Sequence, residues 1–495
     1  MMLKLKRRCQ TGRAVASACV AISLLTLGGC AQLPNLGQAP TIKPVEKLQS
    51  EYSLATPFVA DWPDEHWWES YDDYQLSILI AEALRDSPNM QLANARMHMA
   101  EAMVTGANAA ISPEVSANAS VTEAKQSYNY LIPKAALPQG WTDYGQATMN
   151  LSWELDFWGK NHAALAAAIS EQGAAQAEVA QTRLVLSTSV ASVYAELLHL
   201  YAVRDAVEAS LELRNKTVEL FYQRNQNGLE TLASVRQMEA RRAATQAELF
   251  GVDERIALTK NALASLVGAG PDRGLSIQRP VARTINTISL PANLSLNLLG
   301  RRPDIVAARL RTEAAAKRID QQKAGFYPSV NLMAFAGFQA LDIDKMSKAG
   351  SNFGGVGPAI SLPIFNTQRL QGQLRGARAE YDASVATYNA TLSNALREVA
   401  DATTSRRHLD GELAALRAAV TAADDAYRMV DQRYKGSLAT YLDVLSAEDA
   451  LISTRRALAD LETRAVELDV SMVRALGGGY QSTDKQARTA PAING

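Results

Sequence analysis

The fold is decided by residues 147–157, which read ATMNLSWELDF and alternate apolar and polar side chains without interruption. A period of two predicts a β-strand with one apolar and one polar face, because successive strand residues point to opposite sides. A length of about 11 residues suits a tilted membrane-spanning strand. The polar face carries Asn150, Ser152 and Glu154, which would face the pore of a membrane barrel. A strand packed on the helices of a soluble domain fits the pattern equally well.

Three other segments show the same alternation and complete a predicted set of four strands. They lie at residues 115–122, 330–334 and 355–364. The second is the weakest, since Met333 and Phe335 fall on its polar side, and the third should leave the sheet near Pro363. Four strands cannot close a membrane barrel, and an open edge in lipid leaves unpaired backbone groups that cost several kcal/mol each. A membrane location therefore requires several chains that each contribute four strands.

The segment after the quoted strand predicts a very long helix. Residues 160–226 contain no proline and, after Gly173, no glycine, so nothing in them forces a break. At about 1.5 Å per residue this helix is roughly 100 Å long, which excludes a compact globule and predicts a helical rod or barrel. Further Ala-rich helices are expected at 231–268, 369–435 and 440–477, and shorter helices at 72–111 and 303–325. The chain has about 84 alanines, whose small side chains let helices pack closely on both flanks.

Two copies of one unit account for this order of elements. Pro88 matches Pro303 and Pro113 matches Pro328, both at an offset of 215. Further pairs share an offset of 209: Ser152 and Ser361, Arg224 and Arg433, Thr231 and Thr440, and Gly268 and Gly477. The change of offset places a six-residue length difference between about residues 121 and 145, which predicts a loop there. An internal duplication is therefore expected.

The N-terminus predicts a lipoprotein signal. A cationic start is followed by an apolar stretch of about 14 residues, too short to span a bilayer, and then by LGGC at residues 27–30. Small residues before this cysteine predict cleavage after residue 29 and lipidation of Cys30. Cys9 and Cys19 leave with the leader, so the mature chain keeps no free thiol and must be held together by packing. Ala31 favours sorting to the outer membrane, and the proline-containing residues 30–65 are expected to form an anchor and an extended tether.

Composition argues against several functional classes. Lys and Arg total 50 against 51 Asp and Glu, and this formal net charge of −1 lacks the basic surplus of a nucleic-acid-binding protein. The five histidines are scattered, with no pair at metal-ligand spacing, so no metal site is predicted. No phosphate-binding G-x-x-x-x-G-K-[ST] loop and no nucleophile constellation is evident. We therefore predict no catalytic residues, no cofactor and no enzyme.

The chain resembles the TolC-like outer-membrane efflux factors, and in particular the lipoprotein branch of multidrug-resistance outer membrane proteins. The resemblance covers essentially the whole mature chain. It rests on short sequence tags whose order and spacing are specific: WW at 67–68, LDFWGK at 155–160, RPD at 302–304, FYPS at 326–329, LPIF at 362–365 and ALGGGY at 475–480. It implies a mainly α homotrimer, in which three chains of four strands close a 12-stranded transmembrane β-barrel continuous with a long periplasmic α-helical barrel.

The same resemblance implies a passive exit duct of a tripartite efflux system, which carries drugs or other small amphiphilic compounds out of the cell. Its partners are then a periplasmic adaptor (a membrane fusion protein), an inner-membrane efflux pump that supplies the energy, and the lipid of the outer membrane. A type I protein-secretion duct has the same fold and remains an alternative. A non-channel envelope lipoprotein with a coiled-coil stalk is a second alternative, although a stalk needs no amphipathic strands.

The turns between the long helices are the predicted functional positions at the periplasmic tip. The first turn holds Gly228 and Thr231, and the second holds Thr440, followed by Asp443 and Ser446. By the resemblance, Asp443 matches the first acidic position of a ring that constricts the pore, and Ser446 stands where a second acid often lies. The pattern Thr-x-x-Asp also fits a helix N-cap with an acid in the first turn, so both roles of Asp443 stay open.

The expected division of the chain follows from these features. It comprises a signal peptide at 1–29, anchor and tether at 30–65, a first repeat at 66–268, an equatorial linker at 269–300, a second repeat at 301–477 and a C-terminal tail at 478–495. Each repeat holds a helix, two strands and a long helical hairpin. Arg302 with Pro303 predicts the start of a helix in the second repeat rather than a ligand site.

Overall fold

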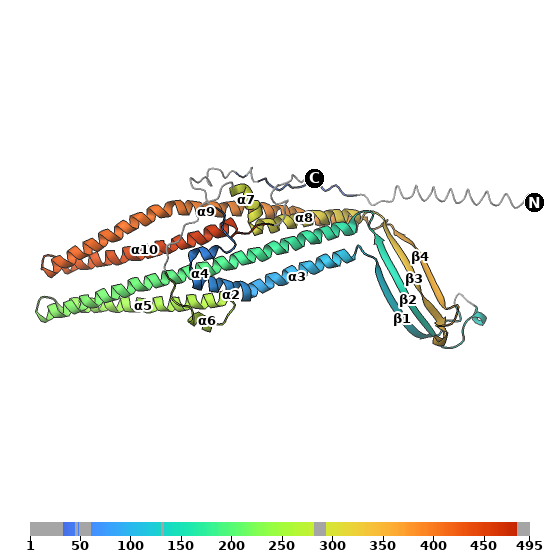
Figure 1. The fold of residues 1–495 in the computed structure, drawn as a ribbon, viewed down its shortest axis with the longest axis horizontal. Coiled ribbons are helices and arrows are strands. Elements are labelled where there is room, and N and C mark those ends of the chain that lie inside the picture. The colour runs from blue at the N-terminus through green and yellow to red at the C-terminus, as the bar shows by residue number, and fades with distance from the viewer. Residues whose placement is uncertain (1–32, 45–47, 49–60, 130–132, 282–293, 483–495) are drawn as a thin grey trace, which may run out of the picture.

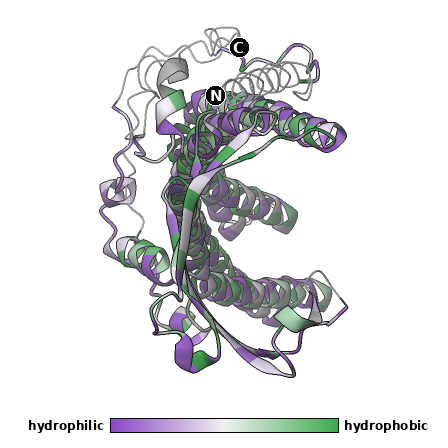
Figure 2. Cartoon of the chain, turned by 90° about the vertical axis from the view of Figure 1, so that its right-hand side faces the viewer, coloured by the Kyte–Doolittle hydropathy of each residue, from purple (hydrophilic) through white to green (hydrophobic). Residues whose placement is uncertain are grey.

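The structure, a computed structural model, describes residues 33–44, 48, 61–129, 133–281 and 294–482. It is a long body with a four-stranded sheet at one end and two antiparallel helical hairpins that reach the other end (Figure 1). Shorter helices flank the hairpins midway. Seen along its length, the chain follows an open arc (Figure 2). The predicted signal peptide, Cys30 and part of the predicted tether lie outside the described residues.

The four strands form one antiparallel sheet in the order β1-β2-β3-β4. They span Glu114–Ala124, Thr142–Leu155, Ser329–Leu341 and Asn352–Ser361. The register places Val115 opposite Leu151 and Leu151 opposite Ala334, which gives one apolar face, while Asn150 lies opposite Ser116 on the other face. Large side chains of the apolar face are exposed in the single chain: Val115, Val121, Met149, Phe338, Val356 and Ile360. The alternation in the sequence therefore corresponds to a sheet with an exposed apolar surface.

β2 ends at Leu155, two residues earlier than the alternation predicted. The carboxylate of Asp156 accepts the backbone N–H of His162 at 2.9 Å, so this side chain satisfies the first turn of the next helix. Phe157 lies in a tight turn, where its N–H donates to Leu155 O at 2.9 Å, and its ring is exposed. Extension of the strand to Phe157 is therefore wrong, because a capping side chain ends the strand first.

The strand expected to be weakest, β3, has 13 residues and pairs with both β2 and β4. Neighbours on both sides satisfy its backbone, which explains why it forms despite a mixed pattern of side chains. β4 ends at Ser361, before Pro363, as predicted. Pro358 lies within β4, which is an edge strand of the single chain, and edge strands are where proline is tolerated in a sheet.

Four long helices make up the two hairpins. α4 spans Lys160–Gln226 and α5 spans Leu232–Leu266, while α9 spans Thr367–Lys435 and α10 spans Tyr441–Leu476. Their bounds agree with the predicted ranges to within two residues, and the unbroken 67-residue helix α4 is confirmed. α4 contains a window apolar enough to cross a membrane, but more than half of that window is buried inside the protein. Packing against other helices therefore accounts for its composition.

The helix predicted at residues 72–111 is in fact two helices, α2 at Tyr74–Asp86 and α3 at Pro88–Ala109. Ser87 breaks the helix because the residue before a proline disfavours the helical conformation and Pro88 has no N–H to donate. The Ser87 hydroxyl oxygen accepts the N–H of Asn89 at 3.3 Å and caps α3. The helix predicted at 303–325 is α8, Pro303–Ala324.

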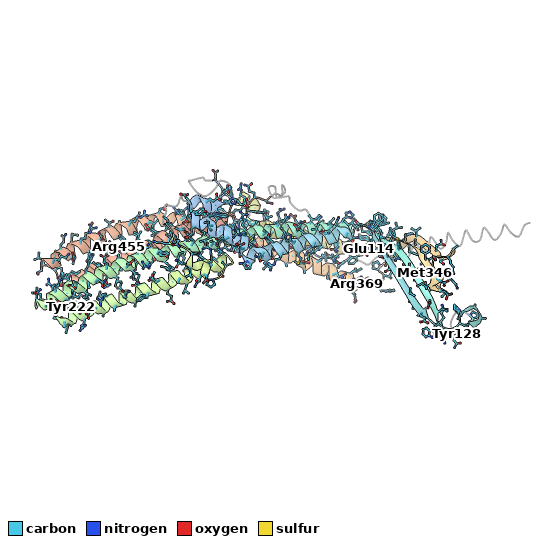
Figure 3. All side chains as sticks on the ribbon, turned by 60° about the horizontal axis from the view of Figure 1, so that its bottom comes forward. Glu114, Tyr128, Tyr222, Met346, Arg369 and Arg455 are labelled. Atoms are coloured by element: carbon cyan, nitrogen blue, oxygen red, sulfur yellow. The ribbon has the colours of Figure 1, made fainter. Side chains whose placement is uncertain are left out.

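Short elements and a midway core complete the body. The short elements are η2 at Trp67–Tyr71, η3 at Lys134–Ala136, α6 at Asp272–Leu275, α7 at Leu294–Arg301 and η4 at Ile343–Lys345. The largest buried cluster lies where η2 and α2 pack against α4 and α5, and it includes Trp67, Leu79 and Leu197. Side chains labelled in Figure 3 mark the two ends of the body, with Tyr222 near the hairpin turns and Tyr128 in the loop beyond the sheet.

Candidate functional site

The turn between α4 and α5 is closed by backbone hydrogen bonds. Gly228 adopts φ = 72°, a left-handed conformation that favours glycine, and the Leu229 N–H donates to Arg224 O at 2.9 Å. Thr231 is the N-cap of α5, and its hydroxyl oxygen accepts the Ser234 N–H at 3.1 Å. The predicted tip residues Gly228 and Thr231 therefore shape this turn, and both are exposed.

The turn between α9 and α10 is closed by a capping box. The hydroxyl oxygen of Thr440 accepts the Asp443 N–H at 3.4 Å, and Oδ2 of Asp443 accepts the Thr440 N–H at 2.8 Å. Hydrogen bonds from the Thr440 side chain and backbone lower the pKa of Asp443. Ser437 adopts φ = 60° here, where a side chain costs about 1 kcal/mol relative to glycine. The cap is observed, whereas pore lining by Asp443 stays a prediction.

The five predicted tip residues fall into two groups, one on each turn. Gly228 and Thr231 belong to the first hairpin, and Thr440, Asp443 and Ser446 belong to the second. Asp443 and Ser446 are both exposed and lie about one helical turn apart on α10. The structure joins Thr440 directly to Asp443, so a single helix start carries the second group.

A buried aromatic cluster holds the two turns together, and the sequence did not predict it. Phe221 of α4 packs against the rings of Tyr434 and Tyr441, with centroids 6.2 and 4.5 Å away. The Tyr434 hydroxyl donates to Glu230 Oε1 at 3.1 Å, and the Arg224 guanidinium lies 4.8 Å over the Tyr434 ring. Burial raises the pKa of Tyr434 to about 12, so its hydroxyl stays a neutral donor at neutral pH. These contacts fix one hairpin against the other.

A buried ionic cluster lies farther along α10, among α4 and α5. Glu448 is 1 % exposed, and neither of its carboxylate oxygens has a hydrogen-bond partner in the described part of the chain. Nη1 of Arg214 lies 3.7 Å from Glu448 Oε1, and the same guanidinium pairs with Asp449 at 3.2 Å. Arg241 pairs with Asp449 at 3.0 Å. Burial raises the pKa of Glu448. The sequence does contain a signal for this buried residue. Glu448 lies at helical spacing between the apolar residues 444, 445 and 451, on the face of the helix that is expected to be buried.

Arg302 ties three helices together. Its buried side chain pairs with Asp304 at 2.6 Å and with Glu398 at 2.7 Å. Nη1 also donates to Ala475 O at 3.1 Å. One guanidinium therefore joins the start of α8 to α9 and to the end of α10. The predicted helix start is observed at Pro303, and the side chain is engaged in packing.

The three predicted pore-side residues lie in one row on the polar face of β2. Asn150 and Ser152 are at least partly exposed, and Glu154 pairs with Lys160 Nζ at 3.0 Å where β2 meets α4. On β3 the same face carries Phe335, directly opposite Asn150. The polar face is thus interrupted at its centre by an apolar side chain.

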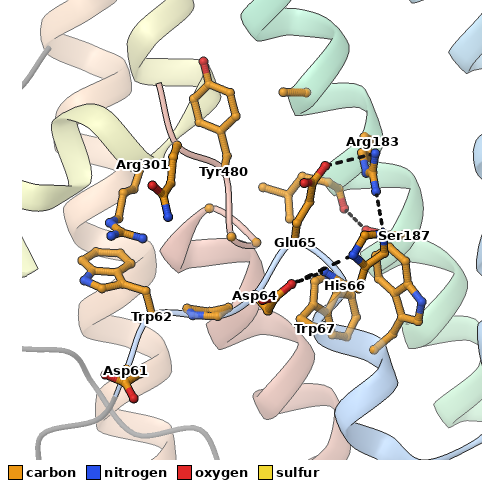
Figure 4. Close-up of a pocket in the computed structure, with 18 residues that line it drawn as sticks. Asp61, Trp62, Asp64, Glu65, His66, Trp67, Arg183, Ser187, Arg301 and Tyr480 are labelled. Carbon is orange, nitrogen blue, oxygen red and sulfur yellow. Dashed lines mark hydrogen bonds and ion pairs between the residues drawn. The ribbon is translucent and has the colours of Figure 1, made fainter. Parts of the chain in front are cut away.

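A cavity midway along the body is lined by the segment before η2, by α4 and by the glycines after α10 (Figure 4). Arg183 of α4 pairs with Glu65 at 3.1 Å, and the Arg301 guanidinium lies 4.7 Å over the Trp62 ring. Gly479 is required here because a Cβ would lie 2.3 Å from the backbone ahead of η2. These contacts pin the N-terminal segment to the helices. Within the described ranges, no group of three or more His, Cys, Asp and Glu side chains is arranged to hold a metal ion.

Comparison with known proteins identifies relatives that span nearly the whole chain. The family model described as outer membrane efflux protein matches residues 79–269 and 294–478. The multidrug resistance outer membrane protein MdtP of Shigella flexneri is 30% identical over 470 residues, which cover 93% of this chain and 95% of that protein. The multidrug resistance outer membrane protein MdtQ of Escherichia coli O157:H7 is 30% identical over 476 residues, which cover 94% of this chain and 98% of that protein.

Solved structures share the fold. The crystal structure of the outer membrane protein VceC from Vibrio cholerae aligns with a TM-score of 0.80 and 48% identity, covering 85% of this chain and all of VceC. The CmeC outer membrane channel of Campylobacter jejuni aligns with a TM-score of 0.82 over 93% of this chain and 97% of its own. CmeC is 20% identical, so its likeness concerns the fold alone.

Proposed function

The chain belongs to the outer membrane efflux protein family, and from this premise we propose that it works as a homotrimeric exit duct. The duct conducts drugs or other small amphiphilic compounds passively, from a periplasmic adaptor and an inner-membrane pump to the exterior. Relatives named for multidrug resistance support this class of substrate. The observation that carries the proposal is the continuity of an amphipathic sheet with the helix α4, which is roughly 100 Å long. Such a body reaches from a membrane deep into the periplasm.

The edges of the sheet support assembly into a closed ring. β1 and β4 are the edge strands of the single chain. In lipid, unpaired backbone groups cost several kcal/mol each, and closure pairs them. Because the four strands alternate in direction, β4 of one copy can pair antiparallel with β1 of the next. Three copies then make a 12-stranded barrel whose apolar face meets lipid, while Asn150, Ser152 and Glu154 line the pore.

Two glycines support an origin by internal duplication. A Cβ on Gly268 would lie 2.8 Å from Asp86 O, and a Cβ on Gly477 would lie 2.0 Å from Arg301 O. Both glycines have positive φ. Each lies against the backbone of a residue two positions before the proline that starts a helix. The two glycines are 209 residues apart and their backbone partners, Asp86 and Arg301, are 215 residues apart, and these are the offsets that relate the two halves of the sequence. The same close contact between a glycine and the backbone therefore holds the end of each hairpin.

The N-terminal segment supports a lipid anchor at the outer membrane. Leu36 packs beside Phe326 and Leu370, at the end of the helices next to the sheet. This part of the predicted tether therefore lies beside the sheet end of the body. We propose that cleavage after residue 29 frees Cys30 for acylation. Cys30→Ala should lose radiolabelled palmitate, and continued labelling would reject the anchor.

The hairpin turns form the periplasmic tip in this proposal, and the adaptor docks there. Asp443 and Ser446, exposed on α10, then lie where three copies narrow the pore, and Asp443 combines a cap with a charge at the constriction. The repeats 66–268 and 301–477 each supply one hairpin, and the linker 269–300 joins them in the sequence. The tail 478–495 follows the last hairpin.

Planar-bilayer recordings test the proposal. The purified protein should be a trimer and should conduct ions in discrete steps. A monomer without a channel would overturn the duct and favour a structural stalk. A type I secretion duct would also conduct, so the substrate separates the two ducts. Cells that lack the protein should become sensitive to drugs and small amphiphiles, whereas loss of a secreted polypeptide without drug sensitivity would favour type I secretion.

A further inference from the structure

A patch of apolar side chains interrupts the polar face of the sheet. It consists of Met333 and Phe335 on β3 and Phe353 on β4, and is called here the β3–β4 apolar patch. The rings of Phe335 and Phe353 have centroids 5.7 Å apart, with planes tilted by 50°. Met333 is 52 % exposed and Phe335 is 43 % exposed. Phe335 is the central residue of the 13-residue β3, so its side chain lies halfway along this strand.

Each member of the patch faces a glycine across the strand pair. The pairs are Met333 with Gly357, Phe335 with Gly355, and Phe353 with Gly337. A Cβ on Gly355 would lie 3.0 Å from Cε1 of Phe335, so this ring rests on the β4 backbone. A Cβ on Gly357 would meet nothing within 4 Å. The surface beside Met333 is therefore open, and a flat molecule can lie there against backbone and rings.

The register assigns the patch to the pore side of the proposed barrel. Phe335 lies opposite Asn150, on the face that also carries Ser116. The other face carries the exposed Val115 and Val356, which suit lipid. In the proposed trimer the patch therefore meets the water of the pore. Contiguous apolar surface in water is unfavourable and commonly marks a place where a ligand or partner binds.

We propose that the β3–β4 apolar patch is a contact site for aromatic amphiphiles in transit, an inference that rests on the proposed exit duct. Aromatic rings pack favourably on Phe335 and Phe353 and against the thioether of Met333. Asn150 is paired with Phe335 in the register, and its amide nitrogen donates to Thr148 Oγ1 at 3.4 Å. Its second N–H and its carbonyl oxygen suit the polar group of such a compound. Conduction requires contacts that are favourable enough to admit a compound and weak enough to release it, which a shallow patch provides.

A purely structural role gives a different expectation. Aromatic rings that cover glycine backbone stabilise a sheet, and Phe335 covers Gly355 in this way. If that were the whole role, removing the rings would lower stability and leave the affinity for aromatic amphiphiles unchanged. Affinity, rather than stability, is therefore the quantity to measure.

Current block by propidium, an aromatic dication, tests the proposal on full-length protein in planar bilayers. The double variant Phe335→Ala/Phe353→Ala should raise the propidium concentration for half-block about tenfold, with the block expressed as a fraction of each channel's own potassium chloride current without propidium. Phe338→Ala is the matched control, because Phe338 lies three residues along β3, is 51 % exposed and belongs to the opposite face. It should leave the block unchanged.

A second variant covers the case in which the double variant fails to assemble. Gly357→Val adds a side chain in open space beside Met333 without removing a ring, and it should also weaken the block about tenfold. A wild-type channel that propidium does not block, or a block that is equal in the wild type and in Gly357→Val, would overturn the patch as a contact site. A wild-type protein that conducts no ions would instead overturn the exit duct, so the two failures are distinguishable.

Discussion

The hydroxyl of Tyr434 on α9 donates a hydrogen bond to Oε1 of Glu230, 3.1 Å away in the turn before α5. The two residues lie 204 positions apart in the chain and belong to different hairpins. Phe221 and Arg224 contact the same tyrosine ring, so this bond lies at the centre of the joint between the turns. Separation of the two turns therefore requires the bond to break.

Tyr434→Phe should loosen this joint while keeping the ring in its stack. A hydrogen bond to a charged group contributes about 1.5–3 kcal/mol, so amide exchange in both turns should accelerate at least roughly tenfold. Hydrogen–deuterium exchange of the purified protein, monitored by mass spectrometry, measures the exchange rates of these amides. Tyr222→Phe is the control, because Tyr222 bonds Glu239 within one hairpin. Equal acceleration in both variants would contradict a joint between hairpins.

Thr440→Ala and Asp443→Asn separate the two roles of Asp443. Thr440→Ala removes the N-cap and should destabilise the first turn of α10 by about 1 kcal/mol, seen as faster exchange of its amides. Asp443→Asn keeps a side-chain acceptor for the Thr440 N–H but removes the charge. If Asp443 lines the pore, this variant should lower the preference of the channel for cations over anions. Asp425→Asn, an exposed acid on α9, serves as the control. Unchanged ion preference in Asp443→Asn would leave the cap as the only role.

Glu448→Gln should stabilise the protein at pH 8 and have little effect near pH 4. Burial raises the pKa of Glu448, so the folded state holds this proton to a higher pH than the unfolded chain does. The carboxyl therefore favours folding below its ordinary pKa of about 4.5, and that contribution is lost as the pH rises through the folded pKa. Glutamine is neutral at both pH values, so Glu448→Gln removes the free-energy cost of burying a charged carboxylate. The thermal unfolding midpoints of the wild type and the variant at both pH values measure this change in stability.

The control for that experiment is Asp449→Asn. Asp449 pairs with both Arg214 and Arg241, so its loss should lower the midpoint at pH 8. A lower midpoint for Glu448→Gln at pH 8 would mean that its attraction to Arg214 outweighs the cost of burial, contrary to the expectation.

Arg302→Met should destabilise the middle of the body strongly. Removal of one partner of a buried ion pair leaves uncompensated charges and costs about 3 kcal/mol or more. Arg311→Met breaks an exposed pair with Glu178 and should cost under about 1 kcal/mol. Denaturant unfolding of the two purified variants compares them. Similar losses would show that Arg302 is not the tie between α8, α9 and α10.

Local patterns in the sequence were sufficient for the long elements. Absence of proline in residues 160–226 predicted α4, and alternation around Asn150 predicted β2. Both patterns depend on the backbone and on immediate neighbours, so one sequence shows them. The errors at Ser87 and Phe157 come from single side chains, a proline neighbour and a capping carboxylate, that end an element before its pattern ends.

Contacts between distant segments could not be predicted in the same way. Nothing near Tyr434 in the sequence indicates Glu230 as its partner, because the pairing depends on how two hairpins lie side by side. The buried Glu448 was visible only as an acid in an apolar series, without its arginine. Phe335 was recognised as an exception to the polar pattern, but its glycine surroundings follow from the strand register.

The two long helices must keep matched lengths. α4 has 67 residues and α9 has 69, and each runs without a break from the sheet to its turn, where Phe221 meets Tyr434. An insertion of seven residues in one helix alone would carry its turn about 10 Å past the other and separate these rings. An insertion or deletion in one of these two helices therefore requires a change of equal length in the other. The distance between the membrane and the tip is thus set jointly by the two halves of the sequence, and neither half can change it alone.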